Sequence, residues 1–177
     1  MTAGRTLHRI IVVPEVSDPR RGFLVAGGFH ARCALGRAGT RRFKHEGDGA
    51  TPAGRFRLLA LLYRSDRLRR PATGLLATAI RPDSGWCDDP ADRRYNRPVT
   101  LPFSARHERL WRDDPLYDVV VVIDYNLAPA VPGAGSAIFL HVASEDLGPT
   151  EGCVAVSGEA MRRLLPRLGP RTIIEIR

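Results

Sequence analysis

The chain has 177 residues, 44% of them hydrophobic and 26% charged, the balance of an ordinary soluble globular protein with a sizeable core. No apolar run approaches the roughly 18 residues that a membrane-spanning helix needs, so we expect no membrane span. The net charge of +8 would attract anions, but the arginines are scattered among acids without zinc-finger spacing or a basic helix, so we expect no nucleic-acid partner.

Short apolar runs separated by glycine, proline and charged residues predict a chain made mainly of β-strands. Four consecutive valines at 119–122 favour a strand that is buried on both faces, because β-branched side chains pack well there. The expected strands lie at residues 7–13, 22–28, 31–35, 55–63, 117–125, 136–142 and 171–177.

Residues 81–116 are rich in proline, aspartate and arginine, and they predict an irregular insert packed onto the sheet by its aromatic side chains. Two interpretations of its conspicuous residues stay open, a contribution to binding or plain core packing. These residues are Trp86, Tyr95, Asn96, Glu108 and Trp111.

One helix is predicted near the C-terminus, before the last strand. Ser157 is a suitable N-cap, and Pro166 should end or kink the helix. Apolar side chains follow at helical spacing, at Met161, Leu164, Leu165 and Leu168. We find no repeat and no linker, so we expect a single domain over residues 1–177.

The N-terminal stretch does not look like a secretory signal peptide. Its apolar run, residues 10–13, is only four residues long, and no small-residue cleavage site follows it. No export signal is therefore expected from this sequence.

The three cysteines predict neither a disulfide framework nor a structural zinc site, because their number is odd and no CxxC pair occurs. Cys33 lies between alanines in a strand-like run and is interpreted as a core residue. Cys87 is followed by Asp88 and Asp89, whose charges would raise its pKa and reduce its reactivity. Cys153 is left as the thiol with a chemical context.

Residues 136–157 contain the most informative pattern of the chain. An expected strand brings His141 to its end, and a turn-rich loop leads back to Cys153. A thiol is a poor nucleophile until it loses its proton, and a nearby imidazole is the usual base. Gly152 has no side chain, so its amide and that of Cys153 could point together at a carbonyl oxygen. The alternative is a buried structural cysteine beside a histidine that ends a strand.

A zinc site made by His141, Glu151 and Cys153 is a competing hypothesis. It requires Glu151 and Cys153 to converge across a single glycine, and no fourth ligand suggests itself. The other histidines form no HxH or HExxH pair. We expect neither a metal nor another cofactor.

This segment resembles the catalytic motif of the L,D-transpeptidase (YkuD-type) domain. That motif has a histidine at a strand end, a variable loop, Ser/Thr-His-Gly-Cys, a short apolar stretch and a helix. His141 matches the base, Thr150 the Ser/Thr, Gly152 the glycine and Cys153 the nucleophile. Residues 46–56, EGDGATPAGRF, resemble the family's Gly…Thr-Pro-x-Gly-x-Phe signature, a turn that feeds a core strand.

The resemblance covers roughly residues 8–177 and implies a mainly β, sandwich- or barrel-like fold with one clear helix between nucleophile and last strand. Two positions depart from the motif. Glu151 stands in place of a histidine, which changes the local charge and should raise the pKa of Cys153. Ala155 stands in place of an arginine linked to substrate carboxylate binding. The loop between His141 and Cys153 is also short, so we expect a divergent branch with the same nucleophile and a different donor site.

The resemblance implies an L,D-transpeptidase, an acyltransferase of peptidoglycan biosynthesis with a part in cell-wall structure and cell shape. Cys153 would release D-alanine from a stem peptide and form a thioester, which an amine would cross-link or water would trim, the latter being L,D-carboxypeptidase activity. Thr150 and Glu151 are expected to contact the substrate. The family implies carbapenem β-lactams as inhibitors and a place in the periplasm or cell envelope, and we expect a monomer.

Two other functions are compatible with the sequence. The first is a non-catalytic peptidoglycan-binding module whose site has decayed through Glu151 and Ala155. The second is a cysteine peptidase or amidase on another peptide, which the missing signal peptide motivates.

Overall fold

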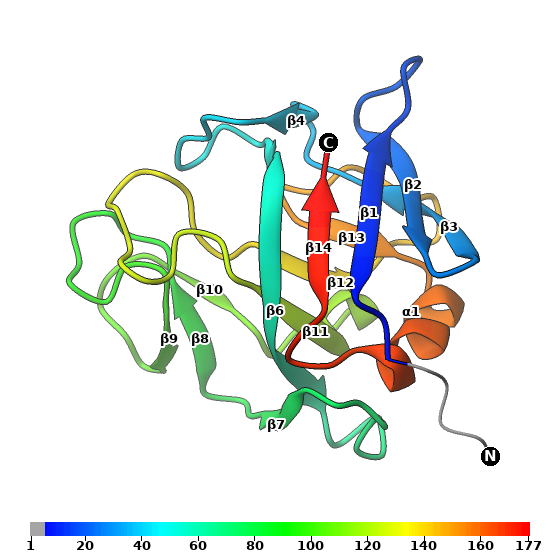
Figure 1. Ribbon diagram of the computed structural model, residues 1–177. Helices are drawn as coiled ribbons and strands as arrows, with labels where there is room; N and C mark the ends of the chain where they lie inside the picture. The colour runs from blue at the N-terminus through cyan, green and yellow to red at the C-terminus, as the bar shows by residue number, and fades with distance from the viewer. Residues whose placement is uncertain (1–5) are drawn as a thin grey trace.

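The computed structural model describes residues 6–177 and has a mainly β architecture (Figure 1). The first five residues, which belong to the stretch inspected for a signal peptide and to the expected domain 1–177, lie outside the described part. All seven expected strands are present. They are β1 (Arg9–Pro14), β2 (Arg21–Ala26), β3 (Phe29–Ala34), β6 (Gly54–Arg64), β11 (Val119–Ile123), β12 (Phe139–Val142) and β14 (Ile173–Ile176).

Nine strands form one sheet in the order β11-β12-β13-β3-β2-β1-β14-β6-β7. An additional pairing of β11 with β6 joins the sheet to itself and gives a closed, barrel-like shape. Four further strands carry no clear signal in the sequence: β7 (Leu76–Ile80), β13 (Val154–Val156) and the short parallel pair β4 (Thr40–Arg41) and β5 (Thr51–Pro52). These strands are short, so period-two alternation gives little signal for them.

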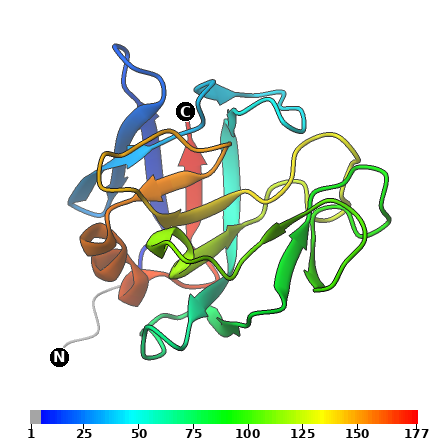
Figure 2. The same cartoon turned by 180° about the vertical axis from the view of Figure 1, so that it is seen from behind.

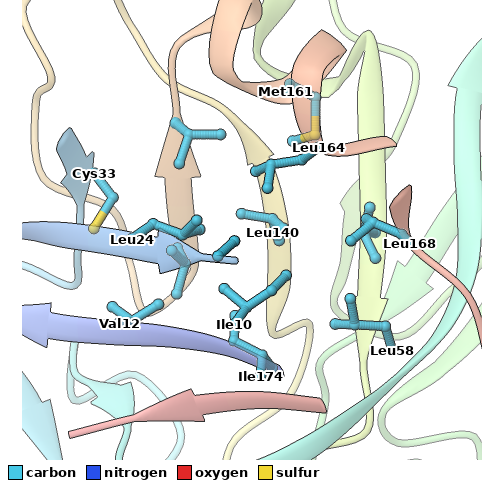
Figure 3. Packing of buried hydrophobic residues seen from close by; sticks show 14 of the residues in the cluster. Ile10, Val12, Leu24, Cys33, Leu58, Leu140, Met161, Leu164, Leu168 and Ile174 are labelled. Carbon is cyan, nitrogen blue, oxygen red and sulfur yellow. The ribbon is translucent and has the colours of Figure 1, made fainter. Parts of the chain in front are cut away.

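The barrel interior holds the main hydrophobic core, part of which Figure 3 shows. The valine-rich strand β11 is buried along its whole length, as its sequence predicted. Its side chains alternate between two hydrophobic clusters. Val119 and Val121 point into the barrel, whereas Val120 and Val122 point outwards. The outward side chains join a second apolar cluster beneath residues 81–116.

The predicted helix begins where expected, and it is shorter than the apolar pattern suggests. Ser157 caps α1 (Gly158–Leu164) by accepting a hydrogen bond from the Ala160 amide. Residues Leu165–Arg167 continue as the 3-10 helix η2, because Pro166 cannot donate the next helical hydrogen bond. The apolar side chains of both pieces pack into the barrel core.

The insert at 81–116 is more regular than predicted. It contains a three-stranded antiparallel sheet, formed by β8 (Ser84–Cys87), β9 (Arg97–Thr100) and β10 (His107–Arg109). Proline is uncommon inside strands, so the proline-rich composition of the insert did not predict them. The three strands pair with one another inside the insert. The 3-10 helix η1 (Pro115–Tyr117) then leads into β11. Figure 2 shows this small sheet, in green, at one side of the barrel.

Two side chains of the insert, Trp86 and Asn96, attach it to the barrel. The Trp86 ring lies edge-on to Phe139, with ring centroids 5.1 Å apart. Asn96 accepts hydrogen bonds from the Trp86 indole at 2.9 Å and from the Ala137 amide at 3.0 Å. Trp86 and Asn96 therefore act in core packing, the second of the two interpretations offered by the sequence.

No helix within residues 6–177 has both the length and the apolar character needed to cross a bilayer.

Candidate active site

His141 and Cys153 face the same side of the sheet because β12 and β13 are neighbouring parallel strands. The register pairs Leu140 with Val154 and His141 with Ala155. Leu140 and Val154 point into the barrel core, so the alternating residues point the other way. Cys153, immediately before β13, belongs to the outer apolar cluster and shares this outward face.

A cavity of about 720 Å³ lies over this face, and both His141 and Cys153 line it. The insert supplies one wall through Arg106, Glu108 and neighbouring residues. The loop before β13 and the side chain of Lys44 complete the lining. The candidate nucleophile and base thus share one concave site with several charged groups, as small-molecule sites commonly do.

The His141 ring is held in a defined orientation. Its Nδ1 atom lies 2.7 Å from the Val142 carbonyl oxygen, to which the neutral ring donates, so Nε2 keeps its lone pair. The Tyr117 ring packs edge-on against the imidazole with a centroid separation of 5.2 Å. Burial lowers the pKa of His141 to about 4, although hydrogen bonding to the Val142 and Leu116 backbones opposes this effect. The ring is therefore neutral at neutral pH and able to accept a proton.

The Cys153 thiol is protonated and enclosed in the resting structure. It donates to the Ala137 carbonyl at 3.3 Å and accepts from the Phe139 amide at 3.4 Å. Burial and the nearby charge of Glu108 raise the pKa of Cys153 to about 12, against the opposing effects of the Phe139 amide and Lys44. Over residues 6–177, the sulfur forms its hydrogen bonds with Ala137 and Phe139 rather than with the His141 ring.

The turn before the cysteine is stabilised by Thr150. Its hydroxyl accepts from the Gly152 amide at 3.1 Å and donates to the Cys153 carbonyl at 2.7 Å. The Gly152 amide therefore donates inside the turn, whereas the sequence led us to expect it, with the Cys153 amide, to point at a substrate carbonyl oxygen. Gly152 has φ +138, and an added Cβ would lie 2.7 Å from the Ala50 carbonyl oxygen, so glycine is required here for conformation and for space.

The second sequence motif meets the first at the nucleophile. Thr51 is fully buried, and its hydroxyl accepts from the Gly36 amide at 2.8 Å and donates to the Cys153 carbonyl at 3.3 Å. The Cys153 carbonyl thus accepts hydrogen bonds from two threonines, Thr51 and Thr150, which lie far apart in the sequence. Residues 46–56 were expected to form only a turn before a strand. The match to Thr-Pro-x-Gly was the signal in the sequence that could have pointed to a role of Thr51 at the site.

Glu151 does not act on the thiol as predicted. Its side chain is 78% exposed and forms an ion pair with Arg37 at the rim of the cavity. The carboxylate that raises the pKa of Cys153 is that of Glu108, from β10 of the insert. Within residues 6–177, no group of three histidine, cysteine or acidic side chains is placed to hold a metal ion. Because Glu151 points outwards to Arg37, it does not join His141 and Cys153 as a third ligand of the zinc site considered from the sequence.

Glu108 lies inside the cavity, so the insert contributes to the site as well as to core packing. It accepts a hydrogen bond of 2.5 Å from the Tyr117 hydroxyl, whose ring packs against His141. Burial raises the pKa of Glu108, although the Tyr117 hydrogen bond opposes this. Glu108, Tyr117 and His141 form one contiguous wall, which no local sequence pattern indicates.

Comparison with known families gives one result. The model of the family described as the L,D-transpeptidase catalytic domain (YkuD) matches residues 9–176, nearly the whole chain. Neither the curated proteins nor the solved structures yield a match.

Proposed function

Because this chain belongs to the L,D-transpeptidase catalytic domain family, we propose that it is a cysteine-dependent acyltransferase acting on peptidoglycan stem peptides. Members of this family are generally acyltransferases, and the family points to a cell-wall substrate. The observation that carries the finer proposal is the shared cavity. Cys153 and a neutral, oriented His141 face it from adjacent strands, with Nε2 of the imidazole left to accept a proton.

In the acylation step, His141 Nε2 takes the thiol proton as the Cys153 sulfur bonds to the stem carbonyl carbon. A pKa of about 12 for the thiol and about 4 for the imidazole disfavours a resting ion pair, so proton transfer accompanies attack. In this step the imidazole would replace the Ala137 carbonyl as the hydrogen-bond partner of the thiol. The carbonyl electrons move to oxygen and form a tetrahedral oxyanion.

Collapse of this intermediate breaks the carbon–nitrogen bond to the terminal D-alanine. The leaving amine takes the proton from the His141 imidazolium, and a thioester remains on Cys153. An amine of a second stem, or water, then gives its proton to His141 and attacks the thioester carbon. The carbon–sulfur bond then breaks, and the departing Cys153 sulfur takes back the proton held by His141. The first acceptor produces a cross-link and the second a trimmed stem. Because the Gly152 amide is engaged by Thr150, the Cys153 amide is the proposed main-chain donor to the oxyanion.

The test is release of D-alanine from a tetrapeptide stem, together with mass-spectrometric detection of a covalent carbapenem adduct. We expect Cys153→Ala to abolish both signals, and Cys33→Ala and Cys87→Ala to retain them. Those two thiols are also buried, so they control for the general effect of removing a cysteine. Activity that persists in Cys153→Ala would overturn the assignment.

A non-catalytic binding module is the second candidate, favoured by one observation. A thiol with a pKa of about 12 and 7% exposure is poorly activated at rest. If the site has lost its chemistry, an electrophilic probe should label Cys153 no faster than Cys33 or Cys87, and stem peptides should bind without turnover. Preferential labelling of Cys153 would exclude this candidate.

A further inference from the structure

Lys44 is the only lysine of the chain, and its side chain lies buried beside the candidate nucleophile. That side chain is 2% exposed. Its stem lies against Gly135, where an added Cβ would come within 2.7 Å of Lys44 Cε. Its Nζ lies 3.5 Å from the position that a Cβ of Gly152 would occupy. The positively charged end of Lys44 thus lies close to Gly152, the residue immediately before Cys153. The side chains of Lys44 and Cys153 line the same cavity.

A short loop holds the ammonium in this position. Asp48 Oδ1 lies 2.7 Å from Lys44 Nζ, and the His45 carbonyl oxygen lies at 3.3 Å. The Asp48 carboxylate also accepts from the His45 and Ala50 amides at 2.8 and 2.9 Å. Although burial alone would raise the pKa of Asp48, the Lys44 ammonium and these amides together lower it. The carboxylate is therefore ionised and fixed at neutral pH.

The ammonium group has capacity for one more partner. It carries three hydrogens, and the bonds to Asp48 and His45 use two of them. Over residues 6–177, Nζ forms no third hydrogen bond within the chain. A buried donor of this kind is costly to leave unused, which favours a role with an anion that forms in the cavity.

The chemistry at Cys153 creates such anions and offers few other groups to stabilise them. Glu151 is turned out to Arg37, the Gly152 amide is engaged by Thr150, and Glu108 is itself an acid. The charge of Lys44 favours the thiolate and opposes the effect of Glu108. An ammonium in a buried site of low dielectric has a strong effect on a neighbouring anion.

We propose that Lys44 stabilises the anions formed at Cys153, namely the thiolate and the tetrahedral oxyanion. The oxyanion part of this inference rests on the proposed function, whereas the thiolate part does not. No bond to Lys44 forms or breaks in the reaction, because it acts through its charge and its third N–H.

The test compares alkylation of Cys153 by the anionic reagent iodoacetate and the neutral reagent iodoacetamide, with the Cys153 peptide quantified by mass spectrometry. We expect Lys44→Met to displace the pH–rate profile of iodoacetamide labelling towards higher pH, because the thiolate loses a stabilising charge. It should also lower the iodoacetate-to-iodoacetamide rate ratio about tenfold, because the charge that attracts an anionic reagent is gone, and Lys44→Arg should restore much of both. Looser packing would change access for both reagents alike and leave the ratio constant. Arg55→Met is the matched control, because this arginine is exposed and pairs with Glu175 on the barrel surface. An equal ratio in Lys44→Met and wild type would overturn the proposal.

D-alanine release separates this inference from the proposed function. If the enzyme is active, Lys44→Met should lower kcat/KM about 100-fold, as loss of an oxyanion donor does. A wild-type protein that releases no D-alanine, together with a lowered alkylation ratio in Lys44→Met, would contradict the proposed function and support Lys44. Normal D-alanine release by the wild type, together with an unchanged alkylation ratio in Lys44→Met, would support the proposed function and contradict the role of Lys44.

A wild-type measurement covers the case in which Lys44→Met does not fold. Protein labelled with ¹⁵N-lysine gives a single side-chain Nζ resonance, because the chain has one lysine. Carboxymethylation of Cys153 places a carboxylate near Nζ and should shift this resonance more than neutral carbamidomethylation does. Equal shifts from the two adducts would overturn the proposal.

Discussion

The Nδ1 atom of His141 lies 2.7 Å from the carbonyl oxygen of Val142, the next residue in the chain. This contact selects the tautomer with the proton on Nδ1 and leaves Nε2 as the basic nitrogen. Histidine at this position can therefore act as a base without a separate carboxylate to orient it.

Replacing His141 by asparagine should remove the base and keep the anchor. The asparagine amide can still donate to the Val142 carbonyl, but no group replaces Nε2. We expect a fall in kcat for D-alanine release of about 1000-fold, within the usual range for loss of a general base. Steady-state kinetics on the variant, with circular dichroism to verify folding, checks this. A fall below tenfold would contradict the role given to Nε2.

The same substitution predicts a change in the pH dependence of stability. Burial lowers the pKa of His141 to about 4, whereas an unfolded histidine titrates near ~6.5. As the pH falls, the unfolded chain takes up the proton first, so the neutral ring's contribution is complete above about pH 6.5 and is lost towards pH 4. Between pH 7.5 and 4.5, wild type should lose about 2.5 kcal/mol of unfolding free energy that His141→Asn does not lose. Urea unfolding at the two pH values measures the difference, and equal losses would contradict a buried neutral ring.

Glu108→Gln should make the thiol more reactive. Burial and the Glu108 carboxylate raise the pKa of Cys153, so a neutral amide at position 108 should lower it. Glutamine can still accept from Tyr117, which limits structural change. The expected result is a pH–rate profile for iodoacetamide labelling displaced towards lower pH. The matched variant Glu151→Gln should leave that profile in place, because Glu151 is exposed and paired with Arg37. Equal profiles for Glu108→Gln and wild type would show that another group raises the pKa.

Gly152→Ala should destabilise the protein strongly. The position combines φ +138 with a 2.7 Å approach of the added Cβ to the Ala50 carbonyl oxygen, so backbone strain and a clash add together. We expect a loss of at least about 3 kcal/mol of unfolding free energy. Gly47→Ala is the control, since Gly47 also has positive φ, +74, but open space around its Cβ position. It should cost only about 1–2 kcal/mol. Similar losses for the two variants would argue against the close approach at Gly152.

Thr51→Val tests the junction of the two motifs. The valine keeps the shape but leaves the buried Gly36 amide without its acceptor, which should cost about 1–3 kcal/mol. It also frees the Cys153 carbonyl from one of its two threonine donors, so D-alanine release should fall along with stability. Thr51→Ser retains the hydroxyl and should preserve activity. Comparable activity in the valine and serine variants would show that Thr51 does not position Cys153.

The local sequence determined seven of the strands and the candidate pair of His141 and Cys153. The valine run of β11 and the Ser157 cap of α1 carry signals that depend on neighbouring residues, because alternation and capping are properties of short segments. The match of Thr150, Gly152 and Cys153 to a family motif indicated the candidate nucleophile. The twelve residues from His141 to Cys153 are enough for the chain to return to the adjacent parallel strand.

Tertiary structure alone decided which charges act on the cysteine. Glu151, next but one to Cys153 in sequence, turns outwards to Arg37, whereas Glu108 and Lys44 reach the site from distant segments. Sequence distance does not report this, because the direction of a side chain depends on strand register and on what the rest of the chain buries around it. The effect of a charge on a pKa then follows from its distance and its burial, which only the folded chain defines.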